Sequence, residues 1–270
     1  MRGSLQIANF FDIPVRVHWS FLLLLAFAGI SSQRLGDTWS ETGWTFLFVG
    51  AIFACVVLHE FGHALMARRF GVGTKDIILL PIGGLARLYA LPEQPGQELL
   101  VAIAGPLVNL VIALLLSPIV WWQSGDEFHQ LFRFFLGISP IIGSQEATFV
   151  QYFIPALLLL NIILALFNLL PAFPMDGGRI LRALLSYRMP RLKATRVAVR
   201  IGQILAILLS VYSVFDEKYS TALIGIFVFY MAQVEYRYAK INHALAANAT
   251  AGPASPSPTE SHPPTPPHIQ

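Results

Sequence analysis

The residues best suited to chemistry are His59-Glu60-Phe61-Gly62-His63, which follow an apolar run at 44–58. On a helix, residues four apart lie about 40° apart around the axis and about 6 Å along it. Both imidazoles can therefore reach one metal ion from the same face. Glu60 falls within the same third of the circumference and could polarise a water bound to that metal. A carboxylate in an apolar helix is costly, and a bound cation would compensate its charge.

A third ligand is required, because a catalytic zinc ion is held by three protein groups and one water. Asp176 is the best candidate, and it lies in the segment PAFPMDGG at 171–178. The prolines of this segment end the preceding helix, and its glycines let the backbone turn sharply. The alternative for Asp176 is the N-cap of a helix that begins near Arg179. Taken together with His59 and His63, we interpret it as a metal ligand.

Six apolar runs predict the elements that hold these groups. The chain is 55% hydrophobic and 12% charged, with a mean hydropathy of +0.62, which indicates a multi-span membrane protein. The segment 74–90 is apolar but interrupted by proline and glycine, so it predicts two short strands. The predicted fold is therefore an all-α polytopic membrane protein with a small β-hairpin-like insertion after the second helix. The six predicted spans are residues 17–32, 44–66, 99–122, 149–170, 198–215 and 221–234.

The basic residues predict an orientation. With the N-terminus in the cytoplasm, fifteen of the eighteen Lys and Arg residues fall on the cytoplasmic side and three on the other. This predicts a plasma (inner) membrane protein with both termini in the cytoplasm. The basic cluster at 179–200 is interpreted as an anchor near anionic lipid, and nucleic-acid binding is not expected. The three residues on the opposite side are Arg34, Arg133 and Lys218.

Two regions are predicted along the chain. Residues 1–245 form a membrane-embedded domain, and residues 246–270 form a cytoplasmic tail that is rich in Pro, Ser and Thr and disordered. The one cysteine, Cys55, excludes an intrachain disulfide and a cysteine-based structural zinc site. Because Cys55 lies one turn before His59, a fourth ligand is conceivable, but we interpret it as a small packing residue.

Three motifs together resemble the site-2 protease family of intramembrane zinc metalloproteases. They are HEFGH at 59–63, AGPLVN at 104–109 and NLLPAFPMDGGR at 168–179, and their order matches that family. The segment PVRVHW at 14–19 is also similar to the compact bacterial and archaeal members of the family. The resemblance implies a zinc metalloprotease domain with one zinc ion per chain. It further implies that His59, His63 and Asp176 are the zinc ligands and that Glu60 is the general acid and base.

The resemblance also covers two asparagines, Asn109 and Asn168. It implies that they contact the substrate backbone or the developing oxyanion, or that Asn168 orders the loop that follows it. The alternative for both is hydrogen bonding between helices.

The implied function is hydrolysis of transmembrane substrate proteins within the bilayer, near its cytoplasmic side, as in regulated intramembrane proteolysis. The strand-prone segment 77–89 could hold an unwound substrate by edge pairing, and a simple surface loop is the alternative. Two other functions stay open: a peptidase that prefers loops or small peptides, and a non-enzymatic membrane scaffold or metal-binding protein with a degenerate site. Regulatory membrane partners are compatible with the sequence but not identified by it.

Overall fold

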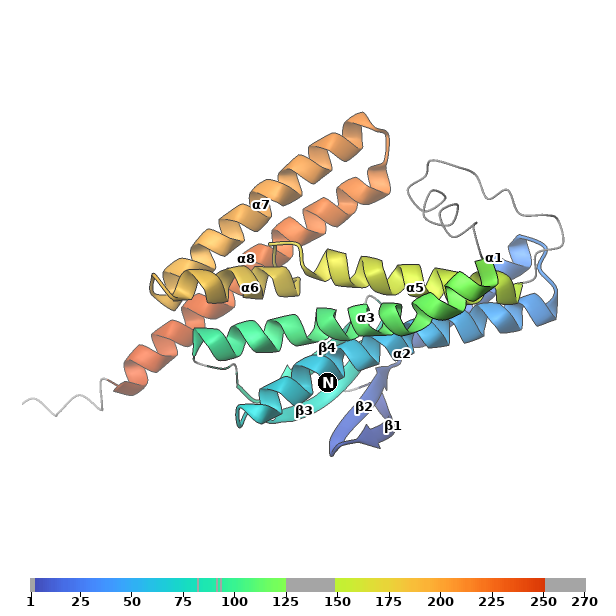
Figure 1. The fold of residues 1–270 in the computed structure, drawn as a ribbon. Coiled ribbons are helices and arrows are strands. Elements are labelled where there is room, and N and C mark those ends of the chain that lie inside the picture. Colours follow the sequence, from blue (N-terminus) through green and yellow to red (C-terminus); the bar gives the residue numbers. More distant parts are fainter. Residues whose placement is uncertain (1–2, 82, 91, 93, 125–148, 251–270) are drawn as a thin grey trace, which may run out of the picture.

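The computed structural model describes residues 3–81, 83–90, 92, 94–124 and 149–250 of the chain. These residues form seven helices and one four-stranded sheet (Figure 1). The elements are β1 (Ser4–Phe10), β2 (Ile13–His18), α1 (Phe21–Arg34), α2 (Trp39–Arg69), β3 (Thr74–Leu80), β4 (Gly83–Leu88), α3 (Pro95–Ser124), α5 (Phe149–Asn168), α6 (Asp176–Ser186), α7 (Arg191–Phe215) and α8 (Tyr219–Thr250).

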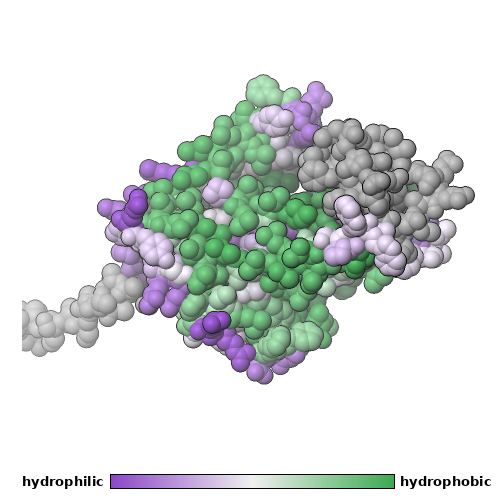
Figure 2. Space-filling view, viewed as in Figure 1, coloured by the Kyte–Doolittle hydropathy of each residue, from purple (hydrophilic) through white to green (hydrophobic). Residues whose placement is uncertain are grey.

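The helical character of the prediction is confirmed. Three of the described helices are long and apolar enough to cross a membrane, namely Trp39–Arg69, Pro95–Trp122 and Arg191–Phe215, and two shorter apolar helices lie at Phe21–Arg34 and Phe153–Asn168. On the face seen in Figure 2, hydrophobic residues cover most of the middle, and hydrophilic ones gather mainly toward its margins. Each of the six predicted spans overlaps a described helix, and a crossing by all six remains a prediction.

The sheet is larger than predicted. The hairpin after the second helix is present as β3 and β4, but β1 and β2 extend it to the order β1-β2-β3-β4, in which β2 and β3 are parallel. The predicted start of the first span at residue 17 is wrong, since Val17 lies in β2 and α1 begins at Phe21. The physical reason is burial: Val15 of β2 pairs with Ile77 of β3, and both pack with Phe61 of α2 in one core cluster.

Helices α2, α3 and α5 lie side by side and form the layer that carries the site (Figure 1). Helix α3 packs against both of the others. The approach of α2 to α3 depends on Gly62, because a Cβ at this position would lie 2.7 Å from the carbonyl oxygen of Ala104. A small residue thus brings the face of α2 that carries His59 and His63 close to α3.

The C-terminal pair α7–α8 joins this layer through α6 and the segment before it. Helix α6 packs against α3 on one side and α7 on the other, and α7 packs along α8. Ala172 and Met175 pack against Ala206 of α7 and Val228 of α8. Figure 1 shows α7 and α8 leaning away from the α2–α3–α5 layer. The segment before α6 is therefore packed against both α7 and α8.

Part of the predicted tail is helical, because α8 continues to Thr250. Residues 251–270 and the predicted loop that contains Arg133 lie outside the described residues.

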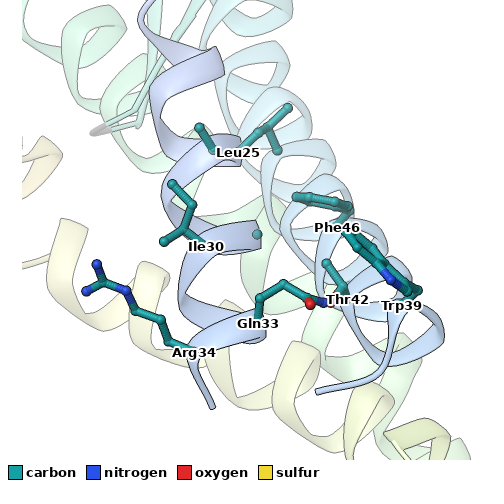
Figure 3. Close-up of a pocket in the computed structure, with 9 residues that line it drawn as sticks. Leu25, Ile30, Gln33, Arg34, Trp39, Thr42 and Phe46 are labelled. Atoms are coloured by element: carbon teal, nitrogen blue, oxygen red, sulfur yellow. Dashed lines mark hydrogen bonds between the residues drawn. The ribbon is translucent and has the colours of Figure 1, made fainter. Parts of the chain in front are cut away.

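A cavity of about 570 Å³ opens between α1 and α2 (Figure 3). Phe46 of its lining precedes His59 by thirteen residues on one helix, a distance of about 20 Å. The cavity is therefore separate from the histidines. Its lining consists of Leu25, Ala26, Gly29, Ile30, Gln33, Arg34, Trp39, Thr42 and Phe46.

Candidate metal centre

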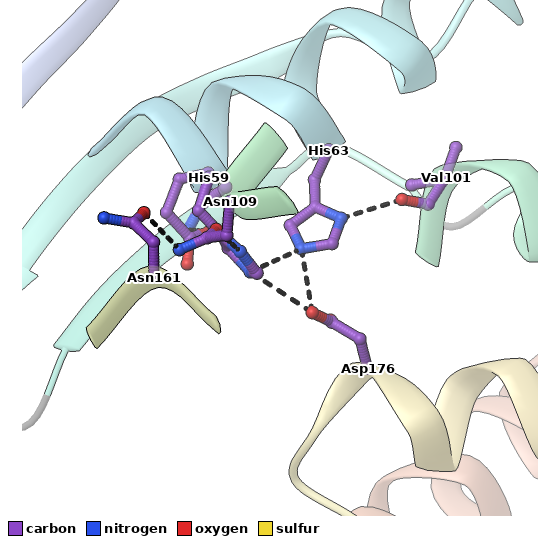
Figure 4. A network of polar contacts seen from close by, with 8 residues as sticks. His59, His63, Val101, Asn109, Asn161 and Asp176 are labelled. Carbon is purple, nitrogen blue, oxygen red and sulfur yellow. Dashed lines mark hydrogen bonds and ion pairs between the residues drawn. The ribbon is translucent and has the colours of Figure 1, made fainter. Parts of the chain in front are cut away.

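Helix α2 and the start of α6 bring His59, His63 and Asp176 together (Figure 4). The Nε2 atoms of the two histidines are 3.1 Å apart. Asp176 Oδ2 lies 3.2 Å from His59 Nε2 and 3.1 Å from His63 Nε2. All three residues are buried, although Asp176 is separated from His63 by 113 positions in the sequence. The convergence predicted from the sequence is therefore present in the structure.

The other ring nitrogen of each histidine is hydrogen-bonded to an oxygen of α3. His63 Nδ1 lies 2.7 Å from the carbonyl oxygen of Val101, which can only accept, so Nδ1–H is the donor. His59 Nδ1 lies 2.7 Å from Oδ1 of Asn109. With Nδ1 protonated, each neutral imidazole presents the lone pair of Nε2 to the cluster. This is the arrangement typical of metal-binding histidines and their hydrogen-bonded supports.

Gly105 of α3 forms the wall of the cluster. A Cβ at this position would lie 2.2 Å from His63 Nε2 and 2.7 Å from His59 Nε2. No side chain larger than hydrogen fits there unless the imidazoles move. The absence of a side chain at Gly105 thus leaves room in front of both Nε2 atoms.

The donor set fits a tetrahedral zinc ion. Zinc at 2.0–2.1 Å from its nitrogen and oxygen ligands requires ligand atoms about 3.3 Å apart, close to the 3.1–3.2 Å observed. Two neutral imidazole lone pairs and a carboxylate oxygen repel one another at such distances, and a cation between them removes the repulsion. Within the described residues, this is the group of His, Cys, Asp and Glu side chains that could hold a metal.

Asp176 is the first residue of α6, and the N-cap position is Met175, so Asp176 does not cap the helix. Its carboxylate faces the histidines at the positive end of the helix dipole, where a negative charge is favoured. Asp176 is therefore an anionic group in the cluster.

A buried ionic network holds α6 in place. Arg182 donates from Nε to Glu98 of α3 over 2.7 Å and from a terminal nitrogen to Glu235 of α8 over 2.9 Å. Arg191, at the start of α7, also contacts Glu98 at 3.0 Å. The interpretation of the whole basic cluster as a lipid anchor is therefore wrong for Arg182, which is 2% exposed and paired inside the protein.

The Glu60 side chain extends from α2 to β4. Its Oε2 accepts a hydrogen bond from the backbone N–H of Ala86 over 2.9 Å. Gly84 admits the side chain, since a Cβ there would lie 2.7 Å from Glu60 Cγ. Glu60 is half-buried, and it follows directly after the cluster residue His59 in the chain.

The two predicted asparagines occupy different surroundings. Asn109 is fully buried and bonds to His59 through its oxygen and to Asn161 through its nitrogen over 3.1 Å. Asn168 is the last residue of α5 and half-exposed, and among the described residues its side chain has no hydrogen bond to the cluster. The sequence analysis missed Asn161, the one amide in the apolar stretch Phe153–Phe167 of α5, where a polar residue is itself a signal. Cys55 is buried and accepts from Asn161 over 3.3 Å, as a packing residue rather than part of the cluster.

Comparison with known proteins agrees with this geometry. The family model for Peptidase family M50 matches residues 47–209. A zinc metalloprotease of Methanocaldococcus jannaschii is 34% identical over 242 residues, which cover 89% of this chain and 63% of the relative. Stage IV sporulation protein FB of Bacillus subtilis is 28% identical over 185 residues, which cover 67% of this chain and 56% of the relative. The chain thus spans 56–63% of the length of these two relatives.

Among solved structures, the site-2 protease from Methanocaldococcus jannaschii is similar to this chain. The two are 34% identical with a TM-score of 0.59, and the match covers 86% of this chain and 95% of that one. The family match, the shared fold and the buried cluster all lead to one assignment. The chain belongs to peptidase family M50, the site-2 protease family of zinc metalloproteases.

Proposed function

We propose that this chain is an intramembrane zinc endopeptidase that hydrolyses peptide bonds of transmembrane substrate proteins near the cytoplasmic side of the bilayer. The observation that carries the proposal is the buried cluster of His59, His63 and Asp176, whose ligand atoms lie within 4.8 Å of one another. A carboxylate, Glu60, stands next to that cluster in the chain. A metal site with only a structural role has no need of such a residue.

We assign one zinc ion per chain to His59, His63 and Asp176. When bound there, zinc would lower the pKa of a water molecule and polarise the scissile carbonyl. The protein supplies the remaining chemistry. Glu60 accepts the proton of the attacking water and delivers it to the leaving amine. The burial of the cluster excludes bulk water and strengthens these electrostatic interactions.

We assign different roles to the two asparagines. Both ends of the Asn109 amide are already bonded, so we assign it to holding His59 rather than to the substrate. Asn168 is half-exposed at the end of α5, eight residues before Asp176, and we retain it as the asparagine that contacts the substrate or orders the loop.

The proposed arrangement in the membrane has six spans, α1, α2, α3, α5, α7 and α8, with both termini in the cytoplasm of a cell bounded by the plasma (inner) membrane. Fifteen basic residues against three support this orientation. Helix α1, with 14 residues, is about 21 Å long, so it would require a locally thin bilayer. Residues 1–245 then form the protease domain, and residues 246–270 form the tail.

The substrate is proposed to bind as an added strand. Strand β4 is the last in the order of the described sheet, so its outer edge is not paired with another strand there. A transmembrane helix must unwind before its carbonyl groups can be attacked, and an extended peptide can then pair with this edge. Contact between Glu60 and β4 places that edge beside the proposed base.

The test uses purified protein in lipid with a reporter cut inside the bilayer and a matched reporter cut in a loop. We expect cleavage of the first by wild type and not by E60Q, H63A or D176A. Equal cleavage by wild type and E60Q would refute the role of Glu60. Preference for the loop reporter would favour the loop peptidase, and zinc at one per chain without hydrolysis of either reporter would favour the scaffold.

A further inference from the structure

Asn161 lies at the centre of the α2–α3–α5 layer. It is a polar residue with no role in the proposed mechanism. It lies on α5, it is completely buried, and it contacts Asn109, which in turn contacts His59 (Figure 4). A buried amide in an apolar helix carries a cost unless its donors and acceptors are satisfied. Both donor hydrogens and the acceptor oxygen of the Asn161 side chain have hydrogen-bond partners, which lie on α2, α3 and α5.

The donor and acceptor of each hydrogen bond in this chain follow from one group whose role is certain, the carbonyl of Leu157. The carbonyl oxygen of Leu157 lies 2.9 Å from the Asn161 side chain, and a backbone carbonyl can only accept. The side of the Asn161 amide that faces Leu157 must therefore be Nδ2. The second hydrogen of that group is directed to the sulfur of Cys55 at 3.3 Å. The Oδ1 atom of Asn161 is thus left as an acceptor that faces Asn109.

The orientation of Asn109 follows from that acceptor. Asn109 donates from Nδ2 to Asn161 Oδ1 over 3.1 Å, and so its own Oδ1 faces His59. That oxygen can only accept, which requires a proton on Nδ1 of His59. In the neutral ring, Nε2 then carries the lone pair that faces Asp176 and His63. The chain of bonds from Leu157 to His59 leaves no alternative orientation for either amide.

We propose that Asn161 is a positioning residue that fixes the metal-binding tautomer of His59 through Asn109. This inference rests on the proposed zinc site. Asn161 forms no hydrogen bond with a proposed metal ligand or with the proposed substrate edge. It acts by orienting the side-chain amide of Asn109. His63 needs no such relay, because it donates directly to the Val101 carbonyl. The two histidines are thus oriented by different means, one by backbone and one by two side chains.

The test replaces Asn161 with side chains that either keep or remove its hydrogen-bonding groups. N161L removes the acceptor for Asn109, whose amide can then turn over. N161D keeps an oxygen toward Asn109 in either protonation state, and when protonated it also donates to Leu157. C55A removes the second acceptor of the Asn161 amide but leaves the fixed point at Leu157, so it serves as the control.

The measurement is Co²⁺ affinity of metal-depleted full-length protein in lipid, from the visible absorption of the bound ion. We expect a loss of about 10- to 100-fold in N161L, the range found when the groups that support metal ligands are changed. We expect N161D and C55A to bind as wild type does. The melting temperature of each metal-free protein shows that it is folded, and N161A carries the same prediction as N161L if the latter does not fold.

The outcomes separate this inference from the proposed function. If wild-type protein binds no Co²⁺, or if H63A binds as well as wild type, the zinc site itself is refuted. If wild type binds and N161L binds equally tightly, the relay is refuted while the site stands. Equal losses in N161L and N161D would also overturn the relay, because they would show that Asn161 contributes packing rather than an acceptor.

Discussion

Replacement of Gly105 by alanine is the sharpest test of the cluster geometry, because it adds one methyl group where the metal is proposed to bind. The new Cβ would lie 2.2 Å from His63 Nε2 and 2.7 Å from His59 Nε2. The optimal separation of non-bonded heavy atoms is about 3.5 Å, so the His63 ring must move by more than about 1 Å. Metal–ligand distances tolerate deviations of only about 0.2 Å. The G105A protein should therefore lose at least about 100-fold in metal affinity, the upper end of what changes around ligands cause.

The assay is isothermal titration of Zn²⁺ into metal-depleted protein in lipid, with activity on a transmembrane reporter as a second readout. G50A is the matched control, since Gly50 is exposed on α2 and a Cβ there would meet nothing within 4 Å. G50A should bind zinc and cleave as wild type does. A G105A protein that binds zinc with wild-type affinity would refute the placement of the ion between these imidazoles.

Three further results are expected. E60Q should bind zinc as wild type does but lose about 10²- to 10⁴-fold in turnover, the contribution of a general acid–base group, and an unchanged rate would contradict that role. R182A leaves Glu98 buried with part of its partner charge removed, so thermal unfolding should show a loss of about 3–5 kcal/mol, whereas an unchanged melting temperature would mean that the network contributes nothing to stability. The hydrogen bond from Arg87 to Asp76 holds the pKa of that carboxyl below its ordinary value of about 3.9, so its stabilising contribution is complete above about pH 4 and is lost as the pH falls through the folded-state pKa. D76N should therefore be less stable than wild type at neutral pH and lose less stability on acidification, and parallel curves for the two proteins would contradict this sign.

The parts of the site that the sequence predicted are those set by local spacing and topology. His59 and His63 share a face because they lie four apart on one helix, and Asp176, the first residue of α6, joins them after the short segment that follows α5. The strand pair after α2 was predictable from the proline and glycine that interrupt an apolar segment.

The parts that were missed depend on partners far apart in the chain. The pairing of Val15 with Ile77 turns an apparent start of a helix into a strand, and no local pattern encodes that pairing. The burial of Arg182 likewise depends on Glu98, 84 residues away, whereas composition places every arginine of its cluster at the surface. A hydropathy scale assigns a value to each residue type without regard to its partners. It therefore cannot show which charges are paired inside the fold.

The hydrogen bond between Glu60 and Ala86 has a consequence for the order of events. The Ala86 N–H that donates to Glu60 cannot donate to β3 at the same time, so it belongs to the open edge of β4. A peptide that adds to this edge competes for the same N–H through its own carbonyl oxygen. Under the proposed role of Glu60, arrival of the peptide would release its Oε2 atom from the Ala86 N–H, so that strand binding and exposure of this carboxylate oxygen would occur in one exchange.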